Sequence, residues 1–153
     1  MTIELFDVRD RERLRVALAL RFEVFVEEQG VPADEEIDAH DREDLDAVHA
    51  VVSDENGAVV AAGRFFRSGA GIAQIGRMVV ARRMRGRGTG AALLEALIAE
   101  ARRRGYERAR LDAQLHAVEF YAKAGFAPAG ERLLDAGIVH QPMEKLIRFS
   151  SNY

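Results

Sequence analysis

A chain of 153 residues is long enough to enclose one hydrophobic core, so a single domain over 1–153 is expected. Its formal charge of −3 gives no general attraction to nucleic acid or anionic membranes, and no apolar stretch approaches the ~20 residues that span a bilayer. The lack of cysteine excludes disulfides, thiolate metal ligands and a cysteine nucleophile. The amino terminus does not resemble a signal peptide, so a cytoplasmic location is expected by elimination.

The first half of the chain predicts a strand, a helical region and three further strands. A strand at 2–8 precedes a helix that Asp10 caps and Val31-Pro32 ends. The apolar stripe of this helix comprises Leu14, Ala17, Leu18, Phe22 and Phe25. An acidic stretch at 34–46 is expected to be a polar loop or a frayed helix. Three strands follow at 47–53, 58–66 and 72–80, with turns at Asn56-Gly57 and at 68–71.

The second half predicts two helices that alternate with strands. A helix with an apolar face follows Gly90 and ends near Gly105, and a strand at 108–114 leads to a second helix that Gly125 ends. Strand-like runs at 126–134 and 138–147 complete the pattern. The passage from 72 to 114 is strand, helix, strand, which requires a parallel pair, whereas hairpins are antiparallel. The sequence therefore predicts one α/β domain with a mixed sheet of about seven strands flanked by helices.

A glycine-rich turn lies between the strand at 72–80 and the helix that follows it. Gly86, Gly88 and Gly90 alternate there, and Arg82, Arg83, Arg85 and Arg87 surround them with positive charge. The first amides of a helix have no intrahelical partners, so they can bind a phosphate that glycines allow to approach closely. The plainer alternative is a tight turn with solvated arginines. A P-loop would need a lysine here, and a dinucleotide site would need the spacing Gly-x-Gly-x-x-Gly, so neither fits.

Three motifs resemble those of GNAT N-acetyltransferases. Residues 85–90 resemble the family's Gln/Arg-x-x-Gly-x-Gly/Ala motif, which cradles the pyrophosphate of acetyl-CoA. The residues Gln114, Ala117, Tyr121 and Gly125-Phe126 resemble the family's Asn-x-x-Ala-x-x-x-Tyr-x-x-x-Gly-Phe, with Gln in place of the usual Asn. A third resemblance, to the ElaA-like branch, rests on Leu20-Arg21, Val24-Phe25-Val26, Glu28-Gln29, Pro32, Asp38, Ile75-Gly76-Arg77, Ala113-Gln114, His116, Gly137-Ile138 and His140.

The resemblance implies a GNAT fold whose sheet splays between the strands at 72–80 and 108–114. The pantetheine of acetyl-CoA would lie in that opening and bind backbone groups of Met78, Val79 and Val80. The cofactor-binding residues implied are these three with Arg85, Gly86, Arg87, Gly88, Thr89, Gly90, Gln114 and Tyr121. Tyr121 is the candidate acid that protonates the departing thiolate, although a tyrosine in an apolar stripe is often only a core residue.

Acetyl transfer also needs a base or a proton path, because a protonated amine has no lone pair. Glu28, His116 and His140 match positions of the ElaA-like motifs and are the candidates, with water as a competitor. Gln74 cannot serve, since an amide takes no proton. His49 lies within a strand and is expected to be structural.

Polar residues elsewhere favour scaffold roles. Arg21 and Arg77 interrupt apolar patterns, so each is expected to pair with a carboxylate, with a scaffold salt bridge favoured over a substrate contact. The acidic stretch at 34–46 would attract a cationic amine or simply be a solvated face. Asp38, His40 and Asp41 do not make a full ligand set, so no metal is expected.

The sequence thus predicts an N-acetyltransferase that moves an acetyl group from acetyl-CoA to an unidentified primary amine, small-molecule or peptide, in a ternary complex. The alternatives are a non-catalytic acyl-CoA binder on the same fold and a protein-interaction module. A longer acyl group would leave the motifs unchanged. Neither nucleic acid nor membrane is an expected partner. The oligomeric state stays open, although GNAT proteins often form homodimers.

Overall fold

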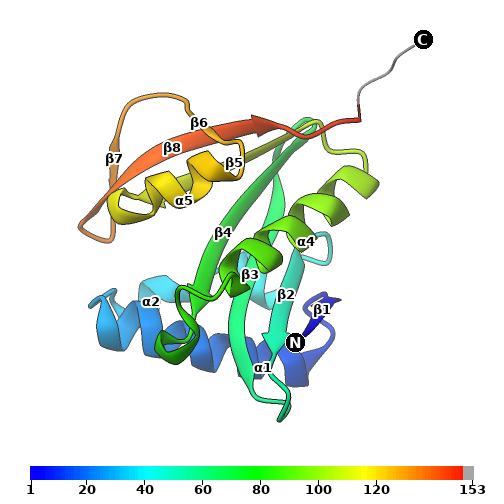
Figure 1. The fold of residues 1–153 in the computed structure, drawn as a ribbon, viewed down its shortest axis with the longest axis vertical. Helices are drawn as coiled ribbons and strands as arrows, with labels where there is room; N and C mark the ends of the chain where they lie inside the picture. Colours follow the sequence, from blue (N-terminus) through cyan, green and yellow to red (C-terminus); the bar gives the residue numbers. More distant parts are fainter. Residues whose placement is uncertain (150–153) are drawn as a thin grey trace.

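The computed structural model describes residues 1–149 and arranges the strands in one mixed sheet in the order β1-β2-β3-β4-β5-β8-β6, with β7 also paired with β8 (Figure 1). Residues 150–153 of the expected domain lie outside the described residues. The strands are β1 (Thr2–Phe6), β2 (Val48–Ser53), β3 (Val59–Gly69), β4 (Ile72–Val80), β5 (Arg108–Gln114), β6 (Ala127–Pro128), β7 (Leu133–Asp135) and β8 (Ile138–Leu146).

The described sheet has eight strands because the run expected at 126–134 is split into β6 and β7, which both pair with β8. Pro128 has no N–H to donate to a strand ladder, and Gly130 has a φ of 107°, so the run cannot continue as one strand. The turns expected at Asn56-Gly57 and 68–71 are confirmed, because β2, β3 and β4 pair antiparallel in sequence order.

The helices are α1 (Arg11–Arg21), α2 (Ala33–Glu36), α3 (Ala39–Arg42), α4 (Thr89–Arg103) and α5 (Val118–Lys123), and α1 continues into a π-helix, η1 (Phe22–Glu28). Asp10 caps α1 as expected, since its carboxylate accepts the Arg13 amide at 3.1 Å. The expected apolar stripe is wrong at Phe22, whose side chain is 44% exposed. The wider turn of the π-helix rotates the residues from Phe22 onward, and Val24 is buried instead.

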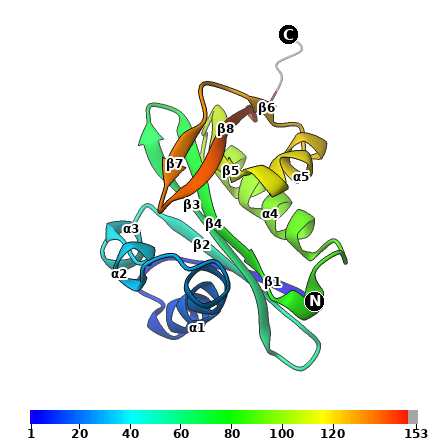
Figure 2. The ribbon, with the colours of Figure 1, turned by 90° about the vertical axis from the view of Figure 1, so that its left-hand side faces the viewer.

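Helices cover both faces of the sheet, with α1, α2 and α3 on one side and α4 and α5 on the other (Figure 2). Consecutive strand residues point to opposite faces, so β2 and β3 contribute to both cores. Val51 and Ala62 pack with Ala17 and Leu20 of α1, whereas the larger core joins the sheet to α4 through Leu93, Leu94, Leu97 and Ile98.

Candidate functional site

β4 and β5 separate partway along their length. They are paired in parallel only from Ile72–Arg108 to Gln74–Arg110, although β4 continues to Val80 and β5 to Gln114. A cleft of about 1080 Å³ occupies the resulting opening. Figure 1 shows β5 and β8 diverging from β4 toward the carboxyl ends of the two parallel strands. The splay expected between 72–80 and 108–114 is confirmed.

A β-bulge lies in β4 where it lines the cleft. β3 pairs through Arg64 with Gly76 and through Ala62 with Val79, so Arg77 and Met78 together lie opposite Gly63. Arg77 has a φ of 51°, in the left-handed region that residues with a side chain rarely adopt. A bulge leaves its extra residue outside the hydrogen-bonded ladder, so backbone polar groups here have no strand partner.

The glycine-rich turn borders one end of the cleft. Gly88 is the N-cap of α4 with a φ of 81°, and no side chain caps the helix. A Cβ added at Gly86 or Gly88 would meet no atom within 4 Å, so the turn faces open space. The first amides of α4 and the positive end of its dipole can therefore receive an anion.

Ten of the eleven residues expected to bind the cofactor line the cleft, and Arg87 does not. The ten are Met78, Val79, Val80, Arg85, Gly86, Gly88, Thr89, Gly90, Gln114 and Tyr121. Their contribution to binding stays a prediction, but their convergence fits an elongated ligand with an anionic group at the turn.

Tyr121 of α5 faces the cleft from a buried position. It is 8% exposed, and its ring packs edge-on against Phe120 and Phe126 with centroid distances of 5.0 and 6.0 Å. Burial raises the pKa of Tyr121 to about 12. The hydroxyl therefore keeps its proton at neutral pH and is available as a hydrogen-bond donor.

His140 of β8 lies across from Gln114 of β5 and is 9% exposed. Its Nδ1 lies 2.8 Å from the carbonyl oxygen of Ile138. Because a carbonyl oxygen only accepts, Nδ1 carries the proton and the neutral ring keeps a lone pair on Nε2. Because His140 lines the cleft, its imidazole can accept a proton there.

The other two candidate bases are placed differently. His116 lines the cleft but is exposed. Glu28 does not line it, and its carboxylate accepts two hydrogen bonds from Arg85 at 3.0 and 3.1 Å. Hydrogen bonding to Arg85 and its charge lower the pKa of Glu28, which makes the carboxylate a weaker base.

Gln29 is a cleft residue to which the sequence motifs assign no role. Its side-chain amide and that of Gln114 exchange hydrogen bonds of 2.8 and 3.2 Å, which joins the end of η1 to the end of β5. Gln at 114 thus has a partner on the opposite wall. The two residues are 85 positions apart, so no local pattern could have indicated the pair.

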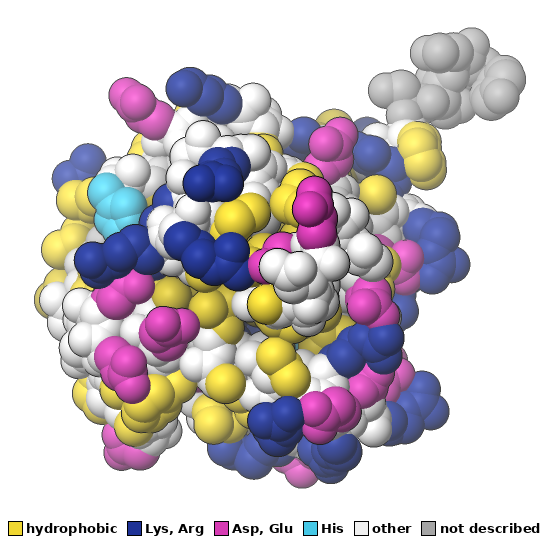
Figure 3. All heavy atoms as spheres, turned by 60° about the horizontal axis from the view of Figure 1, so that its bottom comes forward, with side chains coloured by type: hydrophobic (Ala, Val, Ile, Leu, Met, Phe, Trp, Pro, Cys, Tyr) yellow, Lys and Arg dark blue, Asp and Glu magenta, His cyan; other side chains and the backbone are white. Residues whose placement is uncertain are grey.

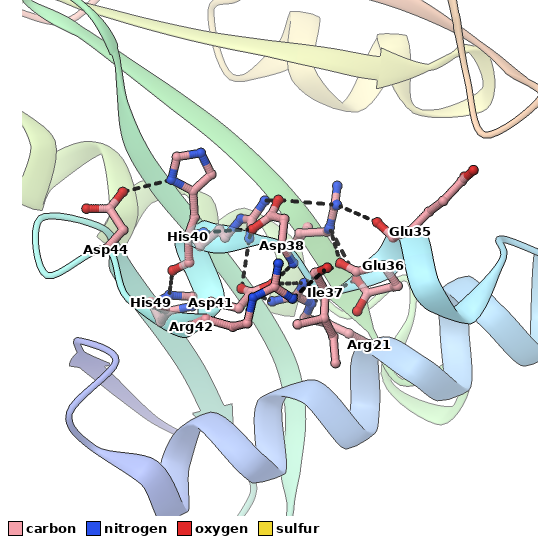
Figure 4. A network of polar contacts seen from close by, with 12 residues as sticks. Arg21, Glu35, Glu36, Ile37, Asp38, His40, Asp41, Arg42, Asp44 and His49 are labelled. Carbon is pink, nitrogen blue, oxygen red and sulfur yellow. Dashed lines mark hydrogen bonds and ion pairs between the residues drawn. The ribbon is translucent and has the colours of Figure 1, made fainter.

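Three arginines and three carboxylates form a network beside the cleft (Figure 4). Arg21 donates to Glu36 at 3.0 Å and to Asp41 at 2.7 and 2.9 Å, and all three side chains are almost fully buried. This confirms a scaffold salt bridge for Arg21. Arg64 forms ion pairs with Asp38 and Asp41. Arg77 forms ion pairs with Glu36 and Asp38, which joins it to the same network. Arg64 was not singled out from the sequence, although it interrupts an apolar strand as Arg21 interrupts a helix.

The stretch at 34–46 holds eight acidic residues, and four of them pair with basic side chains. Besides Glu36, Asp38 and Asp41, Asp44 accepts a hydrogen bond at 2.7 Å from His40, and His49 contacts the His40 carbonyl oxygen at 3.2 Å. His49 is 2% exposed, which agrees with a structural role. Within residues 1–149 no group of three His, Cys, Asp or Glu side chains could hold a metal ion.

Charge differs between the two ends of the cleft. Arg85 lies at the end near α4, whereas other parts of the wall carry Asp112, Asp135 and the paired charges of Asp38, Arg64 and Arg77. On the face shown in Figure 3, apolar side chains gather in the middle, with basic and acidic groups around them. An anion is therefore favoured electrostatically at the turn, and a cation is favoured near Asp112 and Asp135, whereas Asp38 is already paired with Arg64 and Arg77. In the part of the chain that the structure describes, no helix has the length and apolar character to cross a membrane.

Comparisons with known proteins agree with this geometry. The family description "Acetyltransferase (GNAT) domain" matches residues 22–147. The uncharacterized N-acetyltransferase YjcF of Bacillus subtilis is 40% identical over 138 residues, which cover 90% of this chain and 95% of that protein.

Solved structures share the fold. Escherichia coli ElaA is 27% identical and superposes with a TM-score of 0.84, covering 95% of this chain and 99% of ElaA. An aminoglycoside 6'-N-acetyltransferase complexed with coenzyme A is 20% identical, with a TM-score of 0.79 over 99% of this chain and 100% of that one, which is a likeness of fold alone.

Proposed function

The chain belongs to the GNAT acetyltransferase family of acyl-CoA-dependent N-acyltransferases, and from that premise we propose that it transfers an acetyl group from acetyl-CoA to a primary amine. The amine attacks the thioester directly while both substrates are bound. The observation that carries the proposal is the cleft between the separated strands β4 and β5, with the uncapped amino terminus of α4 at one end.

The residues of the cleft fit acetyl-CoA in two places. The amides at Gly88, Thr89 and Gly90, together with Arg85, suit a pyrophosphate. The edge of β4 from Met78 to Val80 has no strand partner in β5, and it suits the amide groups of pantetheine, which would bind there as an added strand does. The Val80 carbonyl oxygen on this strand also accepts a hydrogen bond from Arg85. Open space around Gly86 and Gly88 leaves room for the phosphates.

His140 and Tyr121 supply the proton transfers. Nε2 of His140 accepts a proton from the amine, directly or through water, and the Ile138 carbonyl holds the imidazolium that results. Backbone amides of β4 donate hydrogen bonds to the oxygen of the tetrahedral intermediate. Tyr121 gives its proton to the CoA thiolate as the carbon–sulfur bond breaks. The acidic groups Asp112 and Asp135 favour the approach of a cationic acceptor.

Several features of the proposal stay predictions from the sequence. The acceptor is a small-molecule or peptide amine, the expected location is the cytoplasm, and the assembly that the family resemblance suggests is a homodimer. His116, Glu28 and water remain alternative proton acceptors. A non-catalytic acyl-CoA binder would keep the cofactor contacts without depending on Tyr121 or His140.

A thermal-shift measurement with acetyl-CoA, CoA and dephospho-CoA tests the cofactor site. A ligand at 100 times its Kd stabilises the folded state by about 2.7 kcal/mol, so wild type should melt at a higher temperature. Gly88→Asp places a carboxylate where the pyrophosphate would bind and should abolish the shift. Gly105→Asp is the matched control, since Gly105 also has a positive φ, of 89°, but lies beyond the other end of α4. A wild-type protein that shows no shift would overturn the proposal.

Release of CoA thiol tests catalysis, with putrescine, an aminoglycoside, a dipeptide amide and an Nα-acetyl-lysine amide as acceptors. General acid–base catalysis contributes about 100-fold or more, so His140→Gln and Tyr121→Phe should each lower turnover by about that factor and leave the Kd for acetyl-CoA unchanged. Binding without thiol release from any of the amines would favour the non-catalytic binder.

A further inference from the structure

Arg77 combines two features that seldom occur together. It is a non-glycine residue with a φ of 51°, and it lies in the β4 bulge that lines the cleft. A backbone in this region is strained and persists only where the surroundings hold it. Such strain is concentrated at functional sites, so the contacts that hold Arg77 in this conformation are relevant to the function of the cleft.

The side chain of Arg77 is bound to the segment that follows η1. Its Nε donates to the Glu36 carbonyl oxygen at 3.1 Å, and Nη2 lies 3.5 Å from the Glu35 carbonyl oxygen. Nε also lies 3.2 Å from Oε1 of Glu36, and Nη2 lies 3.5 Å from Oδ2 of Asp38. The guanidinium therefore contacts both backbone and carboxylates of one short stretch of chain.

The stretch that contains Glu36 and Asp38 is held in turn by hydrogen bonds from two buried arginines. Arg21 donates to Oε1 of Glu36 and to its carbonyl oxygen, both at 3.0 Å. Arg64 donates to both oxygens of Asp38, at 2.6 and 2.7 Å. Arg21 and Arg64 are 2% and 3% exposed. Figure 4 shows Glu36, Asp38 and Arg21 converging in this network, which gives Arg77 partners that cannot easily move.

The other side of the bulge is fixed by packing. A Cβ added at Gly63 of β3 would lie 2.6 Å from the sulfur of Met78 and 3.1 Å from a methyl carbon of Leu97. Gly63 thus makes room for the Met78 side chain. The bulge is held by a polar anchor at Arg77 and by an apolar one at Met78, one residue later.

We infer that Arg77 is a positioning residue: its anchorage to Glu36 and Asp38 holds the strained bulge so that a backbone amide of β4 points at the thioester carbonyl of acetyl-CoA. This inference rests on the proposed function. Arg77 acts through the backbone and its guanidinium does not touch the reacting atoms. The thioester oxygen then accepts a hydrogen bond from an amide that β3 leaves unpaired.

Glycine and lysine at position 77 distinguish this role from a direct contact with substrate. Glycine adopts a positive φ without strain, so Arg77→Gly needs no anchor to keep the bulge. Arg77→Lys keeps the positive charge, but lysine is as strained as arginine at a positive φ. Its ammonium group also lacks the planar set of N–H donors of the guanidinium. Positioning predicts that glycine preserves the site better than lysine or alanine. A direct charge contact predicts that lysine preserves it better than glycine.

The readout is the infrared carbonyl band of acetyl-CoA labelled with carbon-13 at the thioester, measured bound and free. A hydrogen bond to the carbonyl shifts this band to lower frequency, and no acceptor amine is required. We expect the band to shift in wild type, to keep roughly half or more of that shift in Arg77→Gly, and to lose most of it in Arg77→Ala and Arg77→Lys. The Kd for CoA, which has no thioester, should be unchanged in all.

Arg67→Ala is the control, because Arg67 is an exposed arginine of β3 whose guanidinium lies over Tyr106, and neither residue lines the cleft. It should leave the band at the wild-type position. A band that shifts in Arg77→Lys but not in Arg77→Gly, or equally in all the variants, would overturn the inference while the cofactor site stands. If wild type does not bind acetyl-CoA, the proposed function fails and the inference falls with it. If Arg77→Ala does not fold, the order of glycine and lysine decides.

Discussion

Glu28 and Arg85 form a two-point ion pair, with N–O distances of 3.0 and 3.1 Å, that joins η1 to the turn before α4. Nε of Arg85 also donates to the Val80 carbonyl oxygen at 2.9 Å. Arg85 is the arginine best placed to bind a pyrophosphate. The carboxylate of Glu28 already occupies its guanidinium and would therefore compete with the pyrophosphate for Arg85. The pair lies partly in solvent, so its contribution to stability is small.

Glu28→Gln should tighten the binding of CoA by about threefold to tenfold, because Arg85 loses its competing negative charge. Titration calorimetry measures the change. Pantetheine, which has no pyrophosphate, is the control ligand and should bind both proteins equally. Weaker CoA binding in Glu28→Gln would mean that Glu28 orients Arg85 instead of competing for it.

Arg21→Leu should lower the free energy of unfolding by about 3–5 kcal/mol, since it leaves the buried carboxylates of Glu36 and Asp41 without their partner. Urea unfolding measures the loss. Arg15→Leu, on the same helix, breaks an exposed pair with Glu12 and should leave the unfolding midpoint unchanged. Equal effects of the two substitutions would contradict the structural role of the network.

His49 should make stability fall in weak acid. Burial lowers the pKa of His49 below its ordinary value of 6.5, so below that pH the unfolded chain binds a proton that the folded one does not. Stability is therefore lost as the pH falls from 6.5 through the folded pKa. Urea unfolding between about pH 7 and about pH 5 should show a shallower loss in His49→Gln than in wild type. Parallel curves for the two proteins would remove His49 as the cause.

Tyr121 should make stability fall in strong alkali. Its pKa rises from 10.0 to about 12 on folding, so between these values the unfolded chain loses a proton that the folded one keeps. Wild type should then lose about 1 kcal/mol more than Tyr121→Phe between about pH 9 and about pH 11. The difference between the two proteins, measured in urea, isolates this residue from the other alkaline groups. An equal loss in both would show that the hydroxyl is not buried.

Much of the architecture could be predicted because it depends on local patterns. The positions of the strands at 47–53 and 72–80, the cap at Asp10 and the helix expected after Gly90, which begins at Thr89, follow from alternation, turn residues and capping chemistry. The errors arose where the backbone departs from regular geometry. Phe22 is exposed because α1 widens into a π-helix, and the run at 126–134 is broken at Pro128 and Gly130.

The sequence by itself determined the family, the place of the glycine-rich turn and the residue types available for proton transfer, because these depend on residue identity and spacing along the chain. Only the tertiary structure decided which side chains meet. Gln29 pairs with Gln114 across 85 residues and Glu28 with Arg85 across 57, and His140 takes the tautomer that the Ile138 carbonyl imposes. The left-handed Arg77 has no local signal either, since its conformation is held by Glu36 and Asp38, which strand register and helix packing bring to it.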